Sequence, residues 1–217
     1  MIRLLAALAC LSALAGCGDG APVAANQAAA APKAEAPRAP APLGDVVRVR
    51  IDTEMGPIVV ALDHKRAPLT SENFVRYAEE GRFDGTTFYR AAKTPRSEGR
   101  GFIQGGIRRD YRRMLPPIAH EPTSATGLRH REGTISMARA EEGAGAIGDF
   151  FITASAMPAM DAHGDSPGYA AFGQVVEGMD IVRRILAAPT LSNAGRGAMR
   201  GQWLASPVRI VRARPVE

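Results

Sequence analysis

Cysteine is scarce in this chain and absent from its larger, C-terminal part. The 217 residues contain two cysteines, Cys10 and Cys17, and both lie near the N-terminus. If the chain is cleaved before Cys17, no cysteine pair is left for an intramolecular disulfide, and a catalytic thiol is excluded from the folded part. A hydrophobic content of 46% is enough for one sizeable domain, whose core alone must stabilise the fold.

Signals for metals, phosphates and nucleic acids are also weak. The formal net charge of +5 does not by itself indicate a nucleic acid partner. His120, His130 and His163 fit no familiar metal-ligand spacing and are interpreted as surface histidines. Residues 141–148 are glycine-rich but lack the lysine of a phosphate-binding loop. The basic cluster 108–113 could touch phosphates, although we favour a solvated loop. We expect no metal, no cofactor and no nucleic acid partner.

The N-terminal residues are typical of an export signal. Arg3 gives a positive start, and Leu4–Leu14 form an apolar run that is too short to span a bilayer well. The run ends in Leu14-Ala15-Gly16-Cys17, which resembles the processing site of a bacterial lipoprotein. Residues 1–16 would then be the signal peptide, and lipid on Cys17 would anchor the protein in the cell envelope, facing the periplasm. The alternative is an ordinary secretory signal that contains a cysteine.

The segment after this signal cannot build a core. Residues 17–44 consist almost entirely of alanine and proline with a few charges, and they show no hydrophobic period. Because frequent proline stiffens a linker, we expect a semi-extended tether that holds the domain of residues 45–217 away from the membrane.

Hydrophobic periodicity in residues 45–217 predicts short strands and two helices. Val46–Asp52 alternates apolar and polar side chains, and Ile58–Leu62 follows it after a turn, so the pair is a predicted hairpin. Pro68–Glu80 and Met179–Ala187 carry apolar residues at helical spacing. The remaining predicted strands are Thr87–Ala91, Phe102–Gly105, Thr134–Ala138, Phe150–Ala154, Ala171–Val176 and Val208–Ala213. This pattern favours a closed antiparallel barrel, but alone it does not distinguish a barrel from a sandwich.

Three segments carry polar groups that a plain core strand would not need. They are Phe88-Tyr89-Arg90, then Phe102-Ile103-Gln104-Gly105-Gly106, then Gly133–Ala138 running on to Phe150-Phe151-Ile152. In this order and at these spacings, the chain from Val46 to Ala213 resembles the cyclophilin family of peptidyl-prolyl cis-trans isomerases. The resemblance implies a mainly β fold, a closed eight-stranded antiparallel barrel capped by two α-helices, and an activity that accelerates rotation about X-Pro bonds.

The resemblance also implies which residues act. Arg90 matches the family's catalytic arginine, and its permanently charged guanidinium can stabilise a twisted amide. Gln104 matches the residue that holds the substrate backbone close to that arginine. An apolar pocket would receive the proline ring, and its walls would be Phe102, Phe151 and Met160.

The predicted pocket departs from the family pattern in one place. Two residues usually separate the phenylalanine from the glutamine, whereas only one lies between Phe102 and Gln104. If Gln104 sets the register, Gly101 takes the usual phenylalanine position and Phe102 takes the neighbouring wall. Strand alternation also puts Phe150 and Phe151 on opposite faces, so one should lie in the core and the other at the site.

The predicted rim carries further substitutions. Asp149, Arg139 and Tyr169 stand where the family commonly has glutamine, asparagine and histidine, and Ala138 lies beside them. These changes leave a second interpretation open, a proline-recognising chaperone or binding module with little catalysis. A third is an envelope scaffold that uses the basic cluster 108–113. We favour the enzyme, a monomer that acts on proline-containing segments of exported and envelope proteins as they fold.

Overall fold

The computed structural model describes residues 43–108, 110–139 and 147–217. Contacts group Ala41–Glu217 into one unit. The signal peptide 1–16, lipidation at Cys17 and most of the tether 17–44 lie outside the described residues, so the domain limits stay predictions. In the part of the chain that is described, no helix has both the length and the apolar character needed to cross a bilayer.

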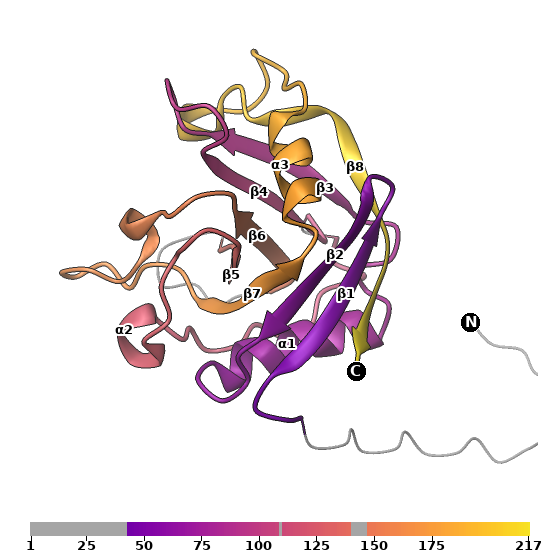
Figure 1. The fold of residues 1–217 in the computed structure, drawn as a ribbon, viewed down its shortest axis with the longest axis vertical. Coiled ribbons are helices and arrows are strands. Elements are labelled where there is room, and N and C mark those ends of the chain that lie inside the picture. Colours follow the sequence, from indigo (N-terminus) through magenta and orange to yellow (C-terminus); the bar gives the residue numbers. More distant parts are fainter. Residues whose placement is uncertain (1–42, 109, 140–146) are drawn as a thin grey trace, which may run out of the picture. The chain divides into compact units, whose positions relative to one another are not determined.

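Eight strands form the sheet: β1 (Val47–Thr53), β2 (Gly56–Leu62), β3 (Thr87–Lys93), β4 (Gly101–Gly106), β5 (Thr134–Met137), β6 (Asp149–Thr153), β7 (Ala171–Glu177) and β8 (Trp203–Val216). They pair antiparallel and close into a barrel in the order β1-β2-β7-β5-β6-β4-β3-β8 (Figure 1). This closure decides between the barrel and the sandwich that the sequence pattern left open.

The two predicted helices are α1 (Pro68–Glu79) and α3 (Met179–Ala187). The first packs against β8, β1 and β7, and the second packs against β3, β2 and β4. The structure adds one helical turn that the sequence pattern did not predict, α2 (Thr123–Thr126), and two 3-10 turns, η1 (Pro158–Met160) and η2 (Gly197–Met199).

Strand β8 is longer than the predicted Val208–Ala213 because it pairs with two neighbours in turn. Its C-terminal part pairs with β1, and its N-terminal part pairs with β3. The register between β3 and β8 shifts between the pairs Phe88↔Val208 and Arg90↔Trp203. Pro207 lies within this irregular stretch, and a proline in a sequence pattern ends a predicted strand. The extension brings the start of β8 next to Arg90.

The barrel interior is apolar and rich in phenylalanine. Phe150 on β6 lies with its ring centroid 5.1 Å from Phe74 on α1 and 5.6 Å from Phe88 on β3, both in edge-on geometry. Phe83 and Phe172 complete the cluster, at 4.9 and 5.4 Å from Phe74. This packing holds β3 and β6 on either side of β4, and these three strands carry Arg90, Gln104 and Phe151 of the predicted site.

Candidate active site

Four neighbouring strands place the predicted site residues in one row. Arg90 on β3 is opposite Gln104 on β4, Gln104 is opposite Phe151 on β6, and Phe151 is opposite Ser136 on β5. A bulge at Tyr89 sets the first of these pairs, because Phe88 is opposite Gly105 and the next paired residue is Arg90. The row lies on the outer face, since the alternating neighbours fill the core.

Arg90 is the central cation of this row. Its Nη1 donates to Gln104 Oε1 at 2.8 Å, and its guanidinium carbon lies 5.0 Å from the centre of the Phe102 ring. Its Nε and Nη2 donate to Gln202 Oε1, a residue that the sequence reasoning did not single out. Burial lowers the pKa of Arg90. The guanidinium keeps its charge because the ordinary pKa of arginine is so high.

Gln104 is oriented by contacts at both ends of its amide. Its Oε1 accepts from Arg90, and its Nε2 donates to the Tyr89 hydroxyl at 2.9 Å. Burial raises the pKa of Tyr89, and the negative charge of Asp149 raises it further, so Tyr89 stays a neutral phenol. Tyr89 was not among the predicted site residues. In the sequence, only its position between Phe88 and Arg90 indicates that it lies near the site.

The apolar wall forms around Phe151, which is 2% exposed. Its ring centroid lies 5.2 Å from Phe102 and 5.4 Å from Tyr169, the latter in edge-on geometry. Phe150, its neighbour in sequence, points into the core instead. The predicted placement of Phe150 and Phe151 on opposite faces of the strand is therefore confirmed. On β4, Phe102 and Gln104 are two residues apart, so both face the site.

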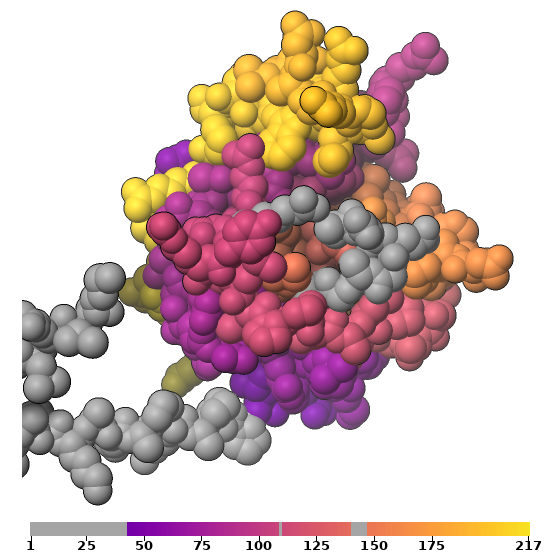
Figure 2. Space-filling model, turned by 180° about the vertical axis from the view of Figure 1, so that it is seen from behind, coloured from indigo at the N-terminus to yellow at the C-terminus, as the bar shows by residue number. Residues whose placement is uncertain are grey.

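The predicted rim residues also gather here. The guanidinium of Arg139 lies 4.8 Å from the Tyr169 ring centre, and the Tyr169 backbone N–H donates to the Met160 carbonyl. At the other edge, the Ala138 N–H donates to the Asp149 carbonyl at 2.9 Å. The C-terminal segment (yellow) and the segment that follows β6 (orange) border one face of the barrel (Figure 2). The structure thus brings the predicted residues together, and their individual roles stay predictions.

Comparison with known proteins now identifies the family. The profile described as cyclophilin type peptidyl-prolyl cis-trans isomerase/CLD matches residues 47–214, which is the barrel. The chain belongs to the cyclophilin family. Its relatives carry the name of the enzyme, so the family assigns this chain peptidyl-prolyl cis-trans isomerase activity.

Two bacterial relatives illustrate the similarity. This cyclophilin is 37% identical to peptidyl-prolyl cis-trans isomerase A of Dickeya dadantii over 145 residues, which are 65% of this chain and 72% of that one. It is 32% identical to peptidyl-prolyl cis-trans isomerase B of Escherichia coli over 154 residues, 70% and 88% of the two chains. A crystal structure of a Cryptosporidium parvum cyclophilin has 20% identity and a TM-score of 0.62 over 78% of this chain and 99% of that one, which supports the fold.

Two glycines of this cyclophilin let the strands of the site approach closely. Gly101 has φ +138°, and a Cβ built there would lie 2.0 Å from the Ala92 carbonyl oxygen of β3. Gly106 has φ +127°, and its Cβ would lie 2.3 Å from the Gly148 carbonyl oxygen beside β6. A side chain is therefore excluded at Gly101, and Phe102 is the first residue of this strand that can carry a ring.

His130 corrects the expectation that the histidines are surface residues. Its side chain is fully buried, its Nδ1 hydrogen-bonds Asp161 at 2.7 Å, and its Nε2 hydrogen-bonds the Ser136 hydroxyl at 2.9 Å. The ring also stacks on Phe151 at 5.8 Å. Although these contacts follow the order of a Ser–His–Asp triad, Ser136 has no exposed surface, so a substrate carbonyl cannot reach it. The network supports the wall of the pocket from behind.

The other two histidines of that expectation, His163 and His120, differ from His130. His163 is exposed, as expected, whereas His120 is half-buried and contacts the Pro167 carbonyl through Nε2 at 3.1 Å. Within the described ranges, no three His, Cys, Asp or Glu side chains are grouped so that they could hold a metal ion.

The buried His130 predicts a pH-dependent stability. Burial lowers the pKa of its imidazole below the ordinary value, although the hydrogen bond and charge of Asp161 oppose this change. The unfolded chain then binds the proton more readily, so the contribution of His130 to the free energy of unfolding is fully present above about pH 6.5 and declines as the pH falls.

Urea unfolding at about pH 7.5 and about pH 5.5 measures the decline, and His130→Gln should remove part of it. An equal decline in both proteins would contradict the assignment to His130. The polar groups that face the ring are Asp161 and Ser136. Arg129 lies beside Asp161, with Nη1 3.6 Å from Oδ2 of that carboxylate.

Most of the described residues of the basic cluster 108–113 are exposed, as expected for a solvated loop. Arg108 stacks over Trp203 at 4.7 Å and over Tyr89 at 5.6 Å, and its backbone N–H donates to Asp149 Oδ1. Arg113 donates to two backbone carbonyls, at 2.8 Å each. Arg108, Asp110, Tyr111 and Arg112 are exposed, and Arg109 lies outside the described residues. Arg108 and Arg113 thus also contact the barrel, and the scaffold interpretation stays a prediction.

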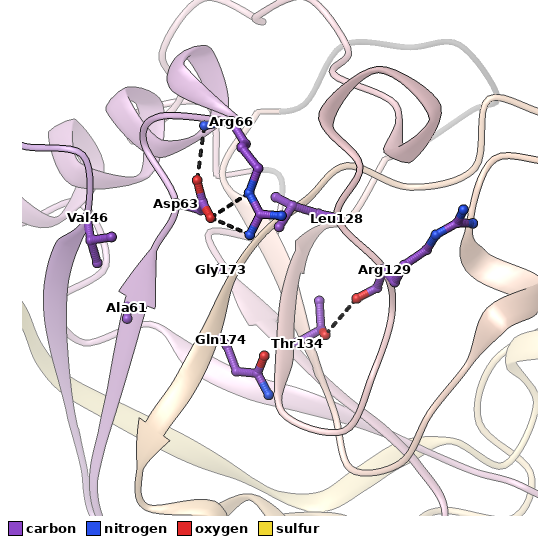
Figure 3. Close-up of a pocket in the computed structure, with 9 residues that line it drawn as sticks. All are labelled: Val46, Ala61, Asp63, Arg66, Leu128, Arg129, Thr134, Gly173 and Gln174. Carbon is purple, nitrogen blue, oxygen red and sulfur yellow. Dashed lines mark hydrogen bonds and ion pairs between the residues drawn. The ribbon is translucent and has the colours of Figure 1, made fainter.

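A separate pocket lies between β2, β7 and the segment before β5 (Figure 3). Its volume is about 220 Å³, and two of its three charged lining residues, Asp63 and Arg66, form an ion pair with each other at 2.6 Å. The residues that line it are Val46, Ala61, Asp63, Arg66, Leu128, Arg129, Thr134, Gly173 and Gln174. Among the described residues it shares none with the predicted site.

Proposed function

We propose that this cyclophilin accelerates X-Pro rotation by placing the charge of Arg90 beside the twisted amide. The barrier of about 20 kcal/mol arises from the resonance of the C–N bond, which is lost as the bond rotates and the nitrogen becomes pyramidal. A donor or cation aimed at this state binds it better than it binds the planar amide, and only such a difference accelerates the reaction. The half-buried, charged Arg90 in the row with Gln104 is the observation that carries the proposal.

Gln104 and the apolar wall would hold the substrate in place. When a peptide binds, the Gln104 amide can exchange its contacts with Arg90 and Tyr89 for contacts with the substrate backbone. The proline ring would pack against Phe102, Phe151 and Met160, away from water. Asp149, Arg139, Tyr169 and Ala138 would contact the neighbouring substrate residues and set the sequence preference.

A protease-free assay tests this function. A short peptide with one X-Pro bond is followed by NMR exchange spectroscopy, in which cis and trans forms give separate signals. We expect catalytic amounts of protein to accelerate exchange, which without enzyme takes roughly tens of seconds or longer. Tight peptide binding without acceleration would instead favour the proline-recognising chaperone or binding module.

We further propose that the protein is a lipoprotein of the bacterial envelope and that its substrates are exported proteins. The support is the sequence Leu14-Ala15-Gly16-Cys17 after an apolar run, followed by an Ala/Pro-rich segment that can act as a tether. Several acyl chains on one residue give stable anchoring, whereas one chain gives marginal binding.

Replacement of Cys17 tests the anchor. We expect the wild type to sediment with membranes and to carry acyl chains on its first residue by mass spectrometry, and Cys17→Ser to lose both. The matched control is Cys10→Ser, which changes the other cysteine and should leave both unchanged. An unlipidated protein that is cleaved elsewhere and is free of the membrane would support the ordinary secretory signal.

A further inference from the structure

Gln202 holds the guanidinium of Arg90 from the side opposite Gln104. Arg90 Nε and Nη2 donate to the same Gln202 Oε1, at 2.9 and 2.6 Å. Together with the bond from Nη1 to Gln104, three of the five N–H donors of Arg90 have partners among the described residues. Within the described part of the chain, the remaining N–H of Nη1 and the remaining N–H of Nη2 have no hydrogen-bond partner, so they can donate to a ligand.

The orientation of Gln202 is itself fixed by its surroundings. Its Nε2 donates to the Ala198 carbonyl at 2.8 Å, so its Oε1 is the end that faces Arg90. Its backbone carbonyl accepts from the Ala91 N–H at 2.9 Å, which ties Gln202 to the residue after Arg90. Gln202 is half-buried, and the next residue, Trp203, is opposite Arg90 in the β3–β8 ladder.

The segment before Gln202 is closed on itself by backbone bonds. The Leu191 N–H donates to the Trp203 carbonyl and the Gly201 N–H donates to the Ala194 carbonyl, both at 2.8 Å. Gly195 has φ +87°, and a Cβ there would lie 2.7 Å from the Trp203 indole nitrogen. These contacts give the Gln202 amide a defined position rather than that of a loose surface side chain.

The choice of an amide at this position has a chemical consequence. A neutral oxygen that accepts from Nε and Nη2 orients the planar guanidinium as a carboxylate would, but it does not compensate the positive charge. A carboxylate would attract the cation strongly in this partly desolvated place and would weaken its effect on any other group. The amide therefore leaves the charge of Arg90 for the ligand.

We propose that Gln202 is a positioning residue that holds Arg90 in its reactive orientation without neutralising it. This inference rests on the proposed function, in which Arg90 acts on the prolyl amide. Gln202 does not itself touch the reacting atoms. The segment that leads into β8 thereby becomes part of the active site, although it lies outside the three segments that carry the family resemblance.

The test compares Gln202→Ala and Gln202→Glu with wild type, using the purified full chain and one X-Pro peptide. Because misplacement of a catalytic group by about 1 Å can cost about 100-fold in rate, we expect Gln202→Ala to lower kcat by roughly 10- to 100-fold. The change in KM should stay within about threefold, because the proline pocket is untouched. Gln202→Glu should keep the orientation but also lose rate, since it pairs the charge. The matched control is Gln174→Ala, a distant glutamine whose Nε2 donates to the Glu132 carbonyl.

A second readout separates positioning from folding. In Gln202→Ala, the ¹⁵N NMR signal of Arg90 Nε should shift, and its proton should exchange faster with water. The midpoint of urea unfolding should be the same for Gln202→Ala and Gln174→Ala. A wild-type kcat in Gln202→Ala, or an unchanged Arg90 signal, would overturn the inference. Full activity of Gln202→Glu would overturn the part that concerns charge. If the wild type does not catalyse at all, the proposed function fails, and the Arg90 signal alone then decides whether Gln202 positions that side chain.

Discussion

Arg90→Ala is expected to lower kcat/KM for an X-Pro peptide by about 100- to 1000-fold, as the loss of one preorganised donor does in other enzymes. Arg90 is the charged group in the row formed by β3, β4 and β6, and its removal also leaves Gln104 Oε1 and Gln202 Oε1 without their donor. The measurement is the exchange rate of the peptide at several substrate concentrations. Most of the loss should appear in kcat, because the apolar wall that binds the ring remains.

Two variants control for charge and for folding. Arg90→Lys keeps a cation but loses the planar fork, so its activity should lie between those of wild type and Arg90→Ala. Arg48→Ala removes an exposed arginine from another strand of the same barrel and should retain full activity. If Arg90→Ala kept most of the wild-type rate while it remained folded, the role assigned to Arg90 would be wrong.

Phe150→Ala is expected to destabilise the barrel by about 3–5 kcal/mol, the usual cost of removing a large buried ring. Phe150 is 0% exposed and its ring meets Phe74, Phe83 and Phe88 in the core. Urea unfolding, followed by circular dichroism, measures the change in the free energy of unfolding. The residual activity at low urea should stay close to that of wild type for the molecules that remain folded.

The matched variant is Phe102→Ala, which removes the same side chain from the outer face. Phe102 is half-buried and contacts Phe151 and Arg90 rather than the core. It should weaken peptide binding and activity more than stability. A Phe102→Ala variant as unstable as Phe150→Ala would show that the ring belongs to the core rather than to the site.

Sequence patterns predicted correctly those features of the fold that depend on residues close together in the chain. Alternation placed Phe150 and Phe151 on opposite faces, and helical spacing gave Met179–Ala187 with the bounds that the structure has. The choice of barrel over sandwich and the assignment of Arg90 and Gln104 came from the resemblance to cyclophilins, since no periodicity distinguishes them. The exclusion of a side chain at Gly101 became visible only with the approach of β3.

Other features of the site could not be predicted from local patterns, because they depend on which strands and loops come into contact in the fold. The bulge at Tyr89 that aligns Arg90 with Gln104 is a property of the β3–β4 ladder. His130 has polar flanking residues typical of a surface loop, yet it is buried because Asp161 and Ser136 satisfy both ring nitrogens. Trp203 and Arg108 are far apart in sequence and stack beside Tyr89.

The sequence by itself determined most of the strand positions and the two main helices, because side-chain alternation and helical periodicity depend on residues that are close together in the chain. Only the tertiary structure decided how the guanidinium of Arg90 is held, because its partner Gln202 is 112 positions away along the chain. Such a contact is set by barrel closure and strand register, and these follow from the packing of the whole core rather than from any one segment.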